Sequence, residues 1–492
     1  MKNGFLSLLL IASLGYAPSY ATEPAHAAAK THSAAETAAV IPSHSPAPKE
    51  EKKAEPQHGH ASAPSAASGH HAVAAGIPAD KLTEPFEFST QLAWFFHSKN
   101  SRELPENELR EFNDSFSEKY HPGDFALRIE SLIASKILIK RGNYLAFRYP
   151  YVYYFLIGRF ISQKLNDKEI RSFVTNCCKH LYVRENANTI LFLAHFTTDE
   201  FVIDAIAGAL HSLFLDFTPL TFSEDTKLVA SVIENAPILT YTGEKPEEHR
   251  KRVGELRDDL DDGGDGLQDS EEAGSHLSLV AQLTVLFKTI EILGQILKNQ
   301  YARIERPRKV ELISEIFSGP LRALHSFFAA FEKHPDYLVA EIDAALEKRG
   351  KLSDPEVRQR IAKRVVGHIV QAMSFGFTQK AGAAVSGDAL RVSVSDSVRE
   401  NGSLAFRLIE SSLILDSPAP LPRSLLKALL EDSKNDVVAI RTLSLQLLHH
   451  MYMFKTSETD KQWLASQEGL HINLTQQHAI EYTTSRTKKL GA

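Results

Sequence analysis

A run of closely spaced carboxylates near the middle of the chain is the first candidate for chemistry. Counted from Asp261, several positions match the calcium-binding loop of an EF-hand, in which oxygen ligands recur at fixed intervals around a glycine. The third position is Gly263 and the eighth is Gln268, where that loop requires an oxygen ligand and an apolar residue. A solvated acidic linker is the alternative, because a loop rich in Asp, Gly and Glu matches this spacing by chance. The matching residues are Asp261, Asp265, Gly266, Asp269 and Glu272.

Motifs for phosphate binding and for hydrolysis are missing from the sequence. A phosphate-binding loop needs glycines that let backbone amides surround phosphates, followed by a lysine and a hydroxyl. Gly350-Lys351 is followed by Leu352 and has no glycine five residues upstream. The patterns G-x-G-x-x-G, H-E-x-x-H, G-x-S-x-G and paired C-x-x-C are also absent. We therefore assign no catalytic, cofactor-binding or metal-ligating residue, expect no cofactor, and predict that the chain is not an enzyme.

The only two cysteines, Cys177 and Cys178, are neighbours in the sequence. Adjacent cysteines rarely bridge each other without strain, so no disulfide framework is expected. We predict that both thiols are small buried hydrophobic groups on a helix, with a redox or metal role as the alternative.

Histidines concentrate between residues 22 and 79, in a tract dominated by Ala, Ser, Pro, His, Lys and Glu. This tract has almost no large apolar side chains, so it is predicted to be a disordered linker, with weak zinc or copper binding as the alternative. A doublet on a Leu-rich helix, His449-His450, is predicted to have one buried and one exposed imidazole. The histidines of the tract are His26, His32, His44, His58, His60, His70 and His71.

Cations and aromatic rings gather between residues 136 and 160. Such residues can contact phosphates and stack on bases. However, the helix that would enter a DNA groove, Phe125 to Ser135, offers only Arg128 as a basic side chain and carries Glu130. We therefore disfavour DNA binding and expect the rings to form a core. The cations are Lys136, Lys140, Arg141, Arg148 and Arg159, and the aromatic residues are Tyr149, Tyr151, Tyr153, Tyr154, Phe155 and Phe160.

The elements that must position these side chains lie between Asp124 and Ser162. Apolar residues at helical spacing predict the helix Phe125 to Ser135, and a turn at Arg141-Gly142-Asn143 joins two β-rich runs, 137–140 and 144–149. An aromatic helix follows from about Pro150. A helix opened by Pro105 and an apolar segment from Leu82 precede them, and this order of three helices and a wing predicts a winged helix-turn-helix. The apolar positions of the helix are Leu127, Ile129, Leu132 and Ile133.

The remaining chain carries a persistent helical period, and strand signals nearly vanish. The predicted fold class is therefore mainly α, a winged helix-turn-helix followed by an α-helical array that could stack as a solenoid. The second helical block is predicted to contain separate helices at 310–317 and 321–331. The predicted parts are a signal peptide at 1–21, the linker at 22–79, the winged helix at 80–162, helical blocks at 163–242 and 276–389 around an acidic flexible loop at 243–275, and C-terminal helices with a polar tail at 390–492.

The N-terminus predicts export. Lys2 precedes the apolar run Phe5 to Leu14, and Ser19 and Ala21 stand where a signal peptidase reads small residues. The mature chain is thus expected to be periplasmic or secreted without a further membrane span, and cytoplasmic if the signal does not function. A formal net charge of -6 gives no global attraction to nucleic acid, so any such binding needs a local basic patch.

Long phrases of the sequence resemble a known family. The run FRYPYVYYFLIGRFIS, preceded by LIASKILIKRGNYLA, resembles the segment after the ATPase core of bacterial STAND-type (NACHT-like) P-loop NTPases. NTILFLAHFTTDEFVIDAIAGAL, FKTIEILGQILKNQY and KVELISEIFSGPLRALHSFF resemble the helical region downstream in such proteins. The resemblance covers most of 85–454 and implies a winged helix with a sensor or regulatory region that packs against an ATPase core. The Walker motifs of that core have no counterpart here, so no catalytic residue carries over and nucleotide hydrolysis is not expected.

The sequence therefore predicts a non-enzymatic interaction or regulatory protein that binds a protein partner. A nucleic-acid-binding winged helix and a metal-binding cell-envelope protein are the alternatives. The oligomeric state stays open.

Overall fold

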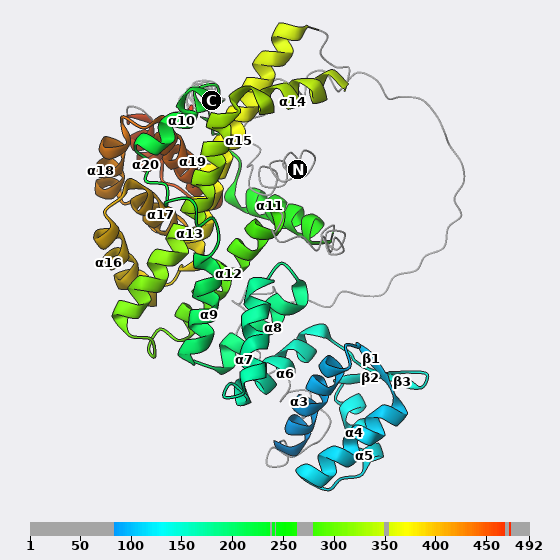
Figure 1. Ribbon diagram of the computed structural model, residues 1–492. Helices are drawn as coiled ribbons and strands as arrows, with labels where there is room; N and C mark the ends of the chain where they lie inside the picture. Colours follow the sequence, from blue (N-terminus) through cyan, green and yellow to red (C-terminus); the bar gives the residue numbers. More distant parts are fainter. Residues whose placement is uncertain are drawn as a thin grey trace, which may run out of the picture. The chain divides into compact units, whose positions relative to one another are not determined.

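The computed structural model describes residues 83–236, 239–241, 243–262, 279–348, 354–467 and 472–473. Helices dominate these residues, which confirms the predicted mainly α class (Figure 1). The contacts between Cα atoms divide them into two compact units, with the boundary between Val152 and Tyr153. We call residues 83–152 the N-terminal unit and the residues from Tyr153 onward the helical unit. The boundary falls inside a helix, ten residues before the predicted end of the winged helix at 162.

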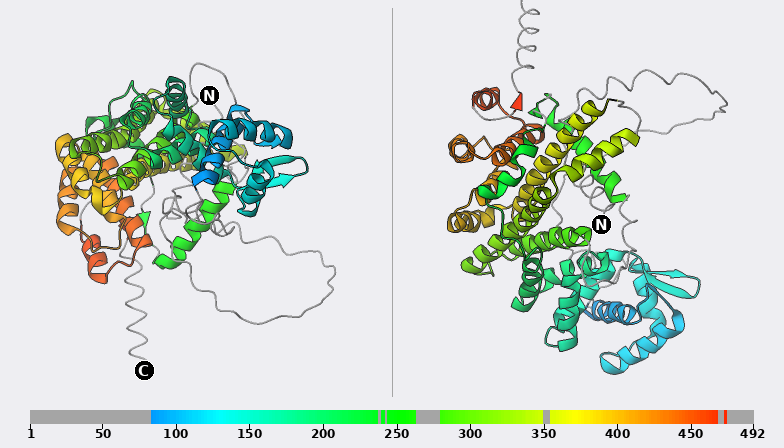
Figure 2. Two further views of the ribbon diagram at one scale, coloured as in Figure 1. Left: turned by 90° about the horizontal axis from the view of Figure 1, so that it is seen from below. Right: turned by 45° about the horizontal axis from the view of Figure 1, so that its top comes forward.

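The N-terminal unit contains three helices and a three-stranded antiparallel sheet. The strands lie in the order β1-β3-β2, so β1 pairs with the β3 edge of the hairpin formed by β2 and β3. The cyan hairpin projects from the unit in Figure 2. The element order of the unit is therefore a helix, a strand, two helices and a hairpin. The sequence did not predict β1, which is only three residues long. The elements are α3 (Thr83–Ser98), β1 (Glu103–Pro105), α4 (Glu106–Lys119), α5 (Phe125–Ala134), β2 (Leu138–Arg141) and β3 (Tyr144–Phe147).

Local sequence signals explain these boundaries. The carboxylate of Asp124 accepts a hydrogen bond from the amide of Leu127 at 3.0 Å, which caps the first turn of α5. Gly142 has a φ of 61°, the left-handed conformation that a two-residue hairpin turn requires and that glycine adopts without steric cost. Leu109 of α4 and Leu145 of β3 are fully buried between the helices and the sheet. The core therefore fixes both the three helices and the hairpin.

The helical unit is an array of antiparallel and crossing helices. Its long helix α15 packs against α10, α12, α13, α14, α17 and α19, so it forms the centre of the array. Two short strands, β4 and β5, pair in parallel at its edge. The elements are α6 (Pro150–Gln163, which begins in the N-terminal unit), α7 (Lys168–Lys179), α8 (Arg184–Phe196), α9 (Glu200–His211), η3 (Glu224–Thr226), α10 (Lys227–Ile233), β4 (Leu239–Thr240), α11 (Pro246–Asp262), α12 (Leu279–Asn299), α13 (Arg306–Lys333), α14 (Pro335–Lys348), α15 (Pro355–Ala384), η5 (Asp388–Leu390), α16 (Arg391–Asn401), α17 (Leu404–Leu415), α18 (Arg423–Ser433), α19 (Val437–Met453), α20 (Glu458–Ala465) and β5 (Ile472–Asn473).

One expectation about this unit was wrong. The predicted break between 317 and 321 does not occur, because α13 continues through Pro320. Proline removes one helical hydrogen bond, but Phe317, Leu321 and Leu324 are fully buried around it, and this packing holds the helix together. The part predicted as C-terminal helices with a polar tail, 390–492, includes the short helix α20, whose Ser457 caps the helix and whose Leu464 is buried.

The signal peptide, the linker with its histidine tract, and most of the acidic loop lie outside the described residues. Within the described part of the chain, no helix combines the length and apolar character needed to cross a bilayer.

Candidate functional site

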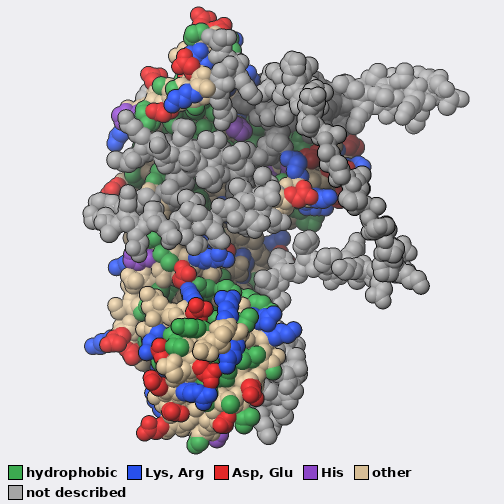
Figure 3. All heavy atoms as spheres, turned by 90° about the vertical axis from the view of Figure 1, so that its right-hand side faces the viewer, with side chains coloured by type: hydrophobic (Ala, Val, Ile, Leu, Met, Phe, Trp, Pro, Cys, Tyr) green, Lys and Arg blue, Asp and Glu red, His purple; other side chains and the backbone are tan. Residues whose placement is uncertain are grey.

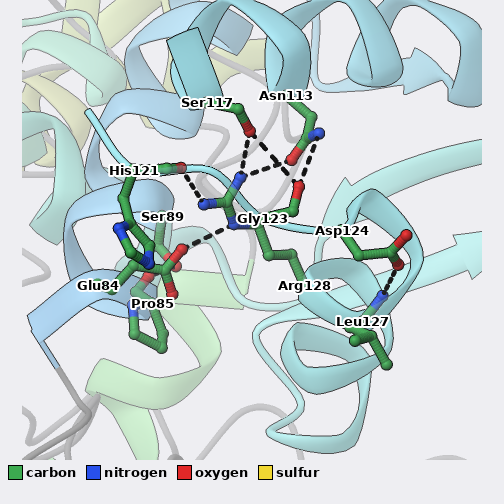
Figure 4. A network of polar contacts seen from close by, with 10 residues as sticks. All are labelled: Glu84, Pro85, Ser89, Asn113, Ser117, His121, Gly123, Asp124, Leu127 and Arg128. Carbon is green, nitrogen blue, oxygen red and sulfur yellow. Dashed lines mark hydrogen bonds and ion pairs between the residues drawn. The ribbon is translucent and has the colours of Figure 1, made fainter. Parts of the chain in front are cut away.

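The interior of the N-terminal unit encloses Arg128, the single basic residue of α5. Its side chain is only 8% exposed. Nε of Arg128 donates to a carboxylate oxygen of Glu84 on α3 at 2.7 Å, and one terminal nitrogen donates to the backbone oxygen of His121 at the same distance (Figure 4). The other terminal nitrogen donates to the side chains of Asn113 at 2.8 Å and Ser117 at 2.9 Å on α4. Arg128 thus connects α5 to both other helices.

Aromatic rings and a glycine complete this enclosure. The guanidinium carbon of Arg128 lies 5.0 Å from the ring centres of both Phe88 and Phe116, within the range of cation–π attraction. Gly123 passes so close that a Cβ atom built on it would be 2.4 Å from that carbon. A side chain at this position would have to displace the guanidinium. Because the side chain is buried and four of its five N–H donors bond within the unit, Arg128 is not available to read bases in a DNA groove.

The outward face of α5 is apolar and acidic. Ala126, Leu127 and Glu130 are exposed, and Leu127 is 69% accessible to solvent. The sequence predicted Leu127 on the buried side. Arg128 takes that place, because it stands three residues after Phe125 and four before Leu132, which are both buried. This same spacing was the signal that could have identified Arg128 as an internal residue.

A groove of about 270 Å³ opens beside Leu127. Its apolar lining comes from Pro85 and Phe88 of α3, Pro122 of the connecting loop, and Leu132 of α5. Carboxylates of Glu84 and Asp124 lie at its margin. A groove of this size admits one side chain rather than a small-molecule ligand.

The β2–β3 hairpin with its flanking residues, 136–148, which we call the wing, carries most of the predicted basic cluster. Lys140 forms an ion pair of 2.7 Å with Glu106, which also accepts from Arg110. Lys136, Arg141 and Arg148 are exposed. Arg159 is not part of this cluster, because it lies in α6 within the helical unit and is half-buried.

The aromatic residues between Tyr149 and Phe160 divide into two groups. The expected core packing is confirmed for Tyr153, Tyr154, Phe155 and Phe160, which are all buried. It is wrong for Tyr149, which is half-buried, and for Tyr151, which is 44% exposed. Tyr151 is the second residue of α6, where the helix face turns to solvent.

Cys177 and Cys178 are free, buried thiols on α7, as predicted. Burial raises the pKa of Cys177 to about 12 and raises the pKa of Cys178 further, so neither is a nucleophilic thiolate near neutral pH. In the other doublet His450 is buried and its Nδ1 lies 2.8 Å from the backbone oxygen of Leu415. His449 is half-buried against the ring of Phe375 instead of exposed, because α15 covers that side of α19.

Sequence reasoning missed a polar cluster that holds α11 on the helical unit. His249 of α11 is 1% exposed and stacks on the ring of Tyr452 of α19, with ring centres 4.9 Å apart. Its Nδ1 lies 3.1 Å from Glu244 and 3.0 Å from Arg252. Burial lowers the pKa of His249, and Arg252 adds to this effect while Glu244 opposes it. A histidine in an otherwise charged helix was the available signal.

No group of three or more metal-binding side chains occurs among the residues that the structure describes. Of the EF-hand-like positions only Asp261 is described, and it belongs to α11. The other matching positions, Asp265, Gly266, Asp269 and Glu272, lie outside the described residues.

A family model described as Novel STAND NTPase 4 matches residues 102–157. The matched segment runs from just before β1 to the middle of α6 and therefore includes α4, α5 and the hairpin. Comparisons with curated proteins and with solved structures gave no match. Over residues 102–157 the chain is thus similar to a family of STAND NTPases, and this similarity supports a STAND-related link.

Proposed function

We propose that the chain is a non-enzymatic interaction or regulatory protein, in which the N-terminal unit is a winged helix that binds a protein partner through α5. The observation that carries this proposal is that neighbouring residues of α5 face opposite ways. Arg128 is enclosed, while Leu127 projects into solvent beside an apolar groove. A helix that presents a leucine and a glutamate suits a protein surface better than a DNA groove.

The chemistry of this surface defines the partner. Leu127 and the groove can bury apolar side chains, and the exposed carboxylates of Asp124 and Glu130 favour a partner with basic residues around its apolar contact. The similarity to STAND NTPases over 102–157 agrees with a docking role, because such a winged helix is expected to pack on another domain. The helical unit would then be a sensor or regulatory region, as the family resemblance implies.

Site-specific photocrosslinking in cells tests the docking surface. Leu127 is replaced by a photoreactive amino acid in the full-length chain, and Val392 of the helical unit, which is 60% exposed, is replaced in a matched control. We expect an adduct with one defined protein from position 127 and none of that adduct from position 392. Adding Glu130→Lys should reduce the adduct, because it reverses the charge next to the contact. Identical adducts from both positions, or none from 127, would contradict the proposal.

The absence of enzyme activity needs its own measurement. The purified full-length chain is incubated with ATP or GTP, and phosphate release is followed. We expect no turnover above that of a mock purification. Hydrolysis that co-purifies with the chain through several columns would overturn the non-enzymatic part of the proposal while leaving the docking surface open to the crosslinking test.

We also propose that the chain is exported, because residues 1–21 have the pattern of a signal peptide. Fractionation of cells with N-terminal sequencing of the mature protein decides it. Cleavage after Ala21 and a periplasmic or secreted pool are the expected result. An intact Met1 in the cytoplasm would refute export.

A further inference from the structure

The wing differs from the rest of the N-terminal unit in the state of its cations. Among the described residues, no carboxylate pairs with Lys136, Arg141 or Arg148. By contrast Arg128 is paired with Glu84, and Lys140 with Glu106. Unpaired cations on one element leave a local positive potential, even on a chain whose overall charge is negative.

The strand register places Arg141 and Arg148 on the same face as an aromatic ring. Arg141 lies directly opposite Tyr144 across the hairpin. The amide of Arg148 donates to the backbone oxygen of Ile137 at 2.8 Å, which extends the same ladder beyond β3. Side chains alternate along a strand, so Tyr144 and Arg148 share one face of the sheet with Arg141. Glu103 of β1 is the carboxylate on that face, next to Ala146.

A stacked column of planar groups continues from this face. The guanidinium carbon of Arg148 lies 5.5 Å from the ring centre of Tyr149, and Nε of Arg148 donates to the hydroxyl of Tyr149 at 3.2 Å. The ring of Tyr149 is stacked on Tyr151, with centres 5.5 Å apart and planes 22° from parallel. Tyr144 is 48% exposed and Tyr151 is 44% exposed. In Figure 3, which views the molecule from the side toward which the hairpin points, Lys and Arg side chains lie open to solvent on this unit.

We propose that this surface, which we call the wing face and define as Arg141, Tyr144, Arg148, Tyr149 and Tyr151, binds single-stranded nucleic acid. The cations contact phosphates, and Tyr144 and Tyr151 offer open ring faces to unpaired bases. Exposed rings interleaved with cations are the two components of sequence-tolerant single-strand binding. Duplex readout is disfavoured because Arg128, the only basic side chain of α5, is enclosed. An acidic peptide would pair with the cations but would supply no planar groups to stack on the exposed tyrosine rings.

This binding activity is separate from the α5 surface and does not depend on the protein-docking proposal. The two surfaces share no residue. Substitutions on the wing face therefore test nucleic-acid binding without altering Leu127 or its groove.

Fluorescence anisotropy of a labelled oligothymidylate of about 20 nucleotides, titrated with the full-length chain at low salt, measures the binding. We expect saturable binding that weakens steeply as salt rises. The double variant Arg141→Glu with Arg148→Glu should lower the affinity at least about tenfold. Tyr151→Ala should lower it about tenfold through the loss of one stacked base, and Tyr151→Phe should retain it.

Matched controls lie elsewhere in the same unit. Tyr120 is also 44% exposed, and Nζ of Lys119 lies 5.3 Å from the centre of its ring. These two residues provide an aromatic side chain and a cation that do not belong to the wing face. Tyr120→Ala and Lys119→Glu should leave the affinity unchanged. Circular dichroism of each variant establishes that it is folded.

Several results would overturn the proposal. The first is no change in anisotropy at low salt, and the second is an equal loss of affinity for the wing-face and control variants. The third is tighter binding of duplex DNA than of the single strand. The last is binding of poly-glutamate as tight as that of the oligonucleotide. The last result would assign the face to an acidic protein, and the third would return it to duplex DNA.

Discussion

Each of the two units uses one buried polar side chain to hold a helix, and the two side chains differ in how they respond to pH. In the N-terminal unit Arg128 of α5 bonds to α3 and α4. In the helical unit His249 of α11 stacks on Tyr452 of α19. A guanidinium keeps its charge at every pH at which proteins fold, whereas an imidazole titrates near neutrality. The attachment of α5 therefore rests on a permanent cation, whereas that of α11 contains an imidazole whose charge depends on pH.

The two tryptophans allow this comparison to be measured unit by unit. Trp94 belongs to α3 of the N-terminal unit, and Trp463 belongs to α20 of the helical unit. A Trp463→Phe background leaves Trp94 as the reporter of the first unit. A Trp94→Phe background leaves Trp463 as the reporter of the second.

The largest expected effect comes from removing the permanent charge. Arg128→Ala in the Trp463→Phe background should lower the free energy of unfolding of the N-terminal unit by about 3 kcal/mol, because Glu84 and Asn113 lose a buried partner. Urea titration followed by Trp94 fluorescence measures the loss. Arg128→Lys should recover little of it, since an ammonium cannot form the same fork of bonds. A change below about 1 kcal/mol would show that the network is not a structural tether.

A second variant tests the space around the same guanidinium. Gly123→Ala places a methyl group 2.4 Å from the guanidinium carbon of Arg128 and should cost about 2 kcal/mol through displaced bonds. Gly208→Ala is the control, because a Cβ there meets nothing within 4 Å and alanine favours the helix α9. Equal urea midpoints for Gly123→Ala and the parent would mean that the enclosure of Arg128 is loose.

The contact of His249 with Tyr452 predicts that the stability of the helical unit decreases as pH falls. Burial holds the folded-state pKa of His249 below its ordinary value of about 6.5, so the folded state resists protonation. The stabilisation is then complete above pH 6.5 and is lost as pH falls toward the lowered pKa. The urea midpoint reported by Trp463 should therefore decrease between pH 7 and pH 5.

His249→Phe isolates this contribution, because phenylalanine keeps the stack on Tyr452 and does not titrate. The decrease in midpoint between pH 7 and pH 5 should be smaller in the variant than in the parent. Other histidines with lowered pKa, such as His368 and His450, contribute equally to both proteins and cancel in the comparison. If the urea midpoints of parent and variant decreased equally with pH, His249 would not be the source of the pH dependence.

The sequence predicted the parts of the fold that local patterns determine. The hairpin turn at Gly142 and the helix of α5 follow from short-range signals. The partner of Arg128 could not be predicted, because Glu84 lies 44 residues earlier and meets it only after α3 packs on α5. The three-residue strand β1 and the passage of α13 through Pro320 likewise depend on tertiary packing. For the site, composition identified the wing cations, but only the register showed which of them share a face with Tyr144.

The smallest expected effect concerns the wing, and it sharpens the contrast with Arg128. Arg141→Glu with Arg148→Glu should change the free energy of unfolding of the N-terminal unit by less than about 0.5 kcal/mol, because neither cation has a carboxylate partner among the described residues. Lys140→Glu should cost up to about 1 kcal/mol, since it breaks an exposed pair and places two carboxylates side by side at Glu106. Trp94 fluorescence in urea measures both. If the double variant unfolds the unit, the wing cations are structural, and any loss of nucleic-acid binding in that variant would follow from unfolding. If it does not, three arginines of this unit serve two purposes: Arg128 is enclosed and builds the fold, and Arg141 and Arg148 are exposed and bind.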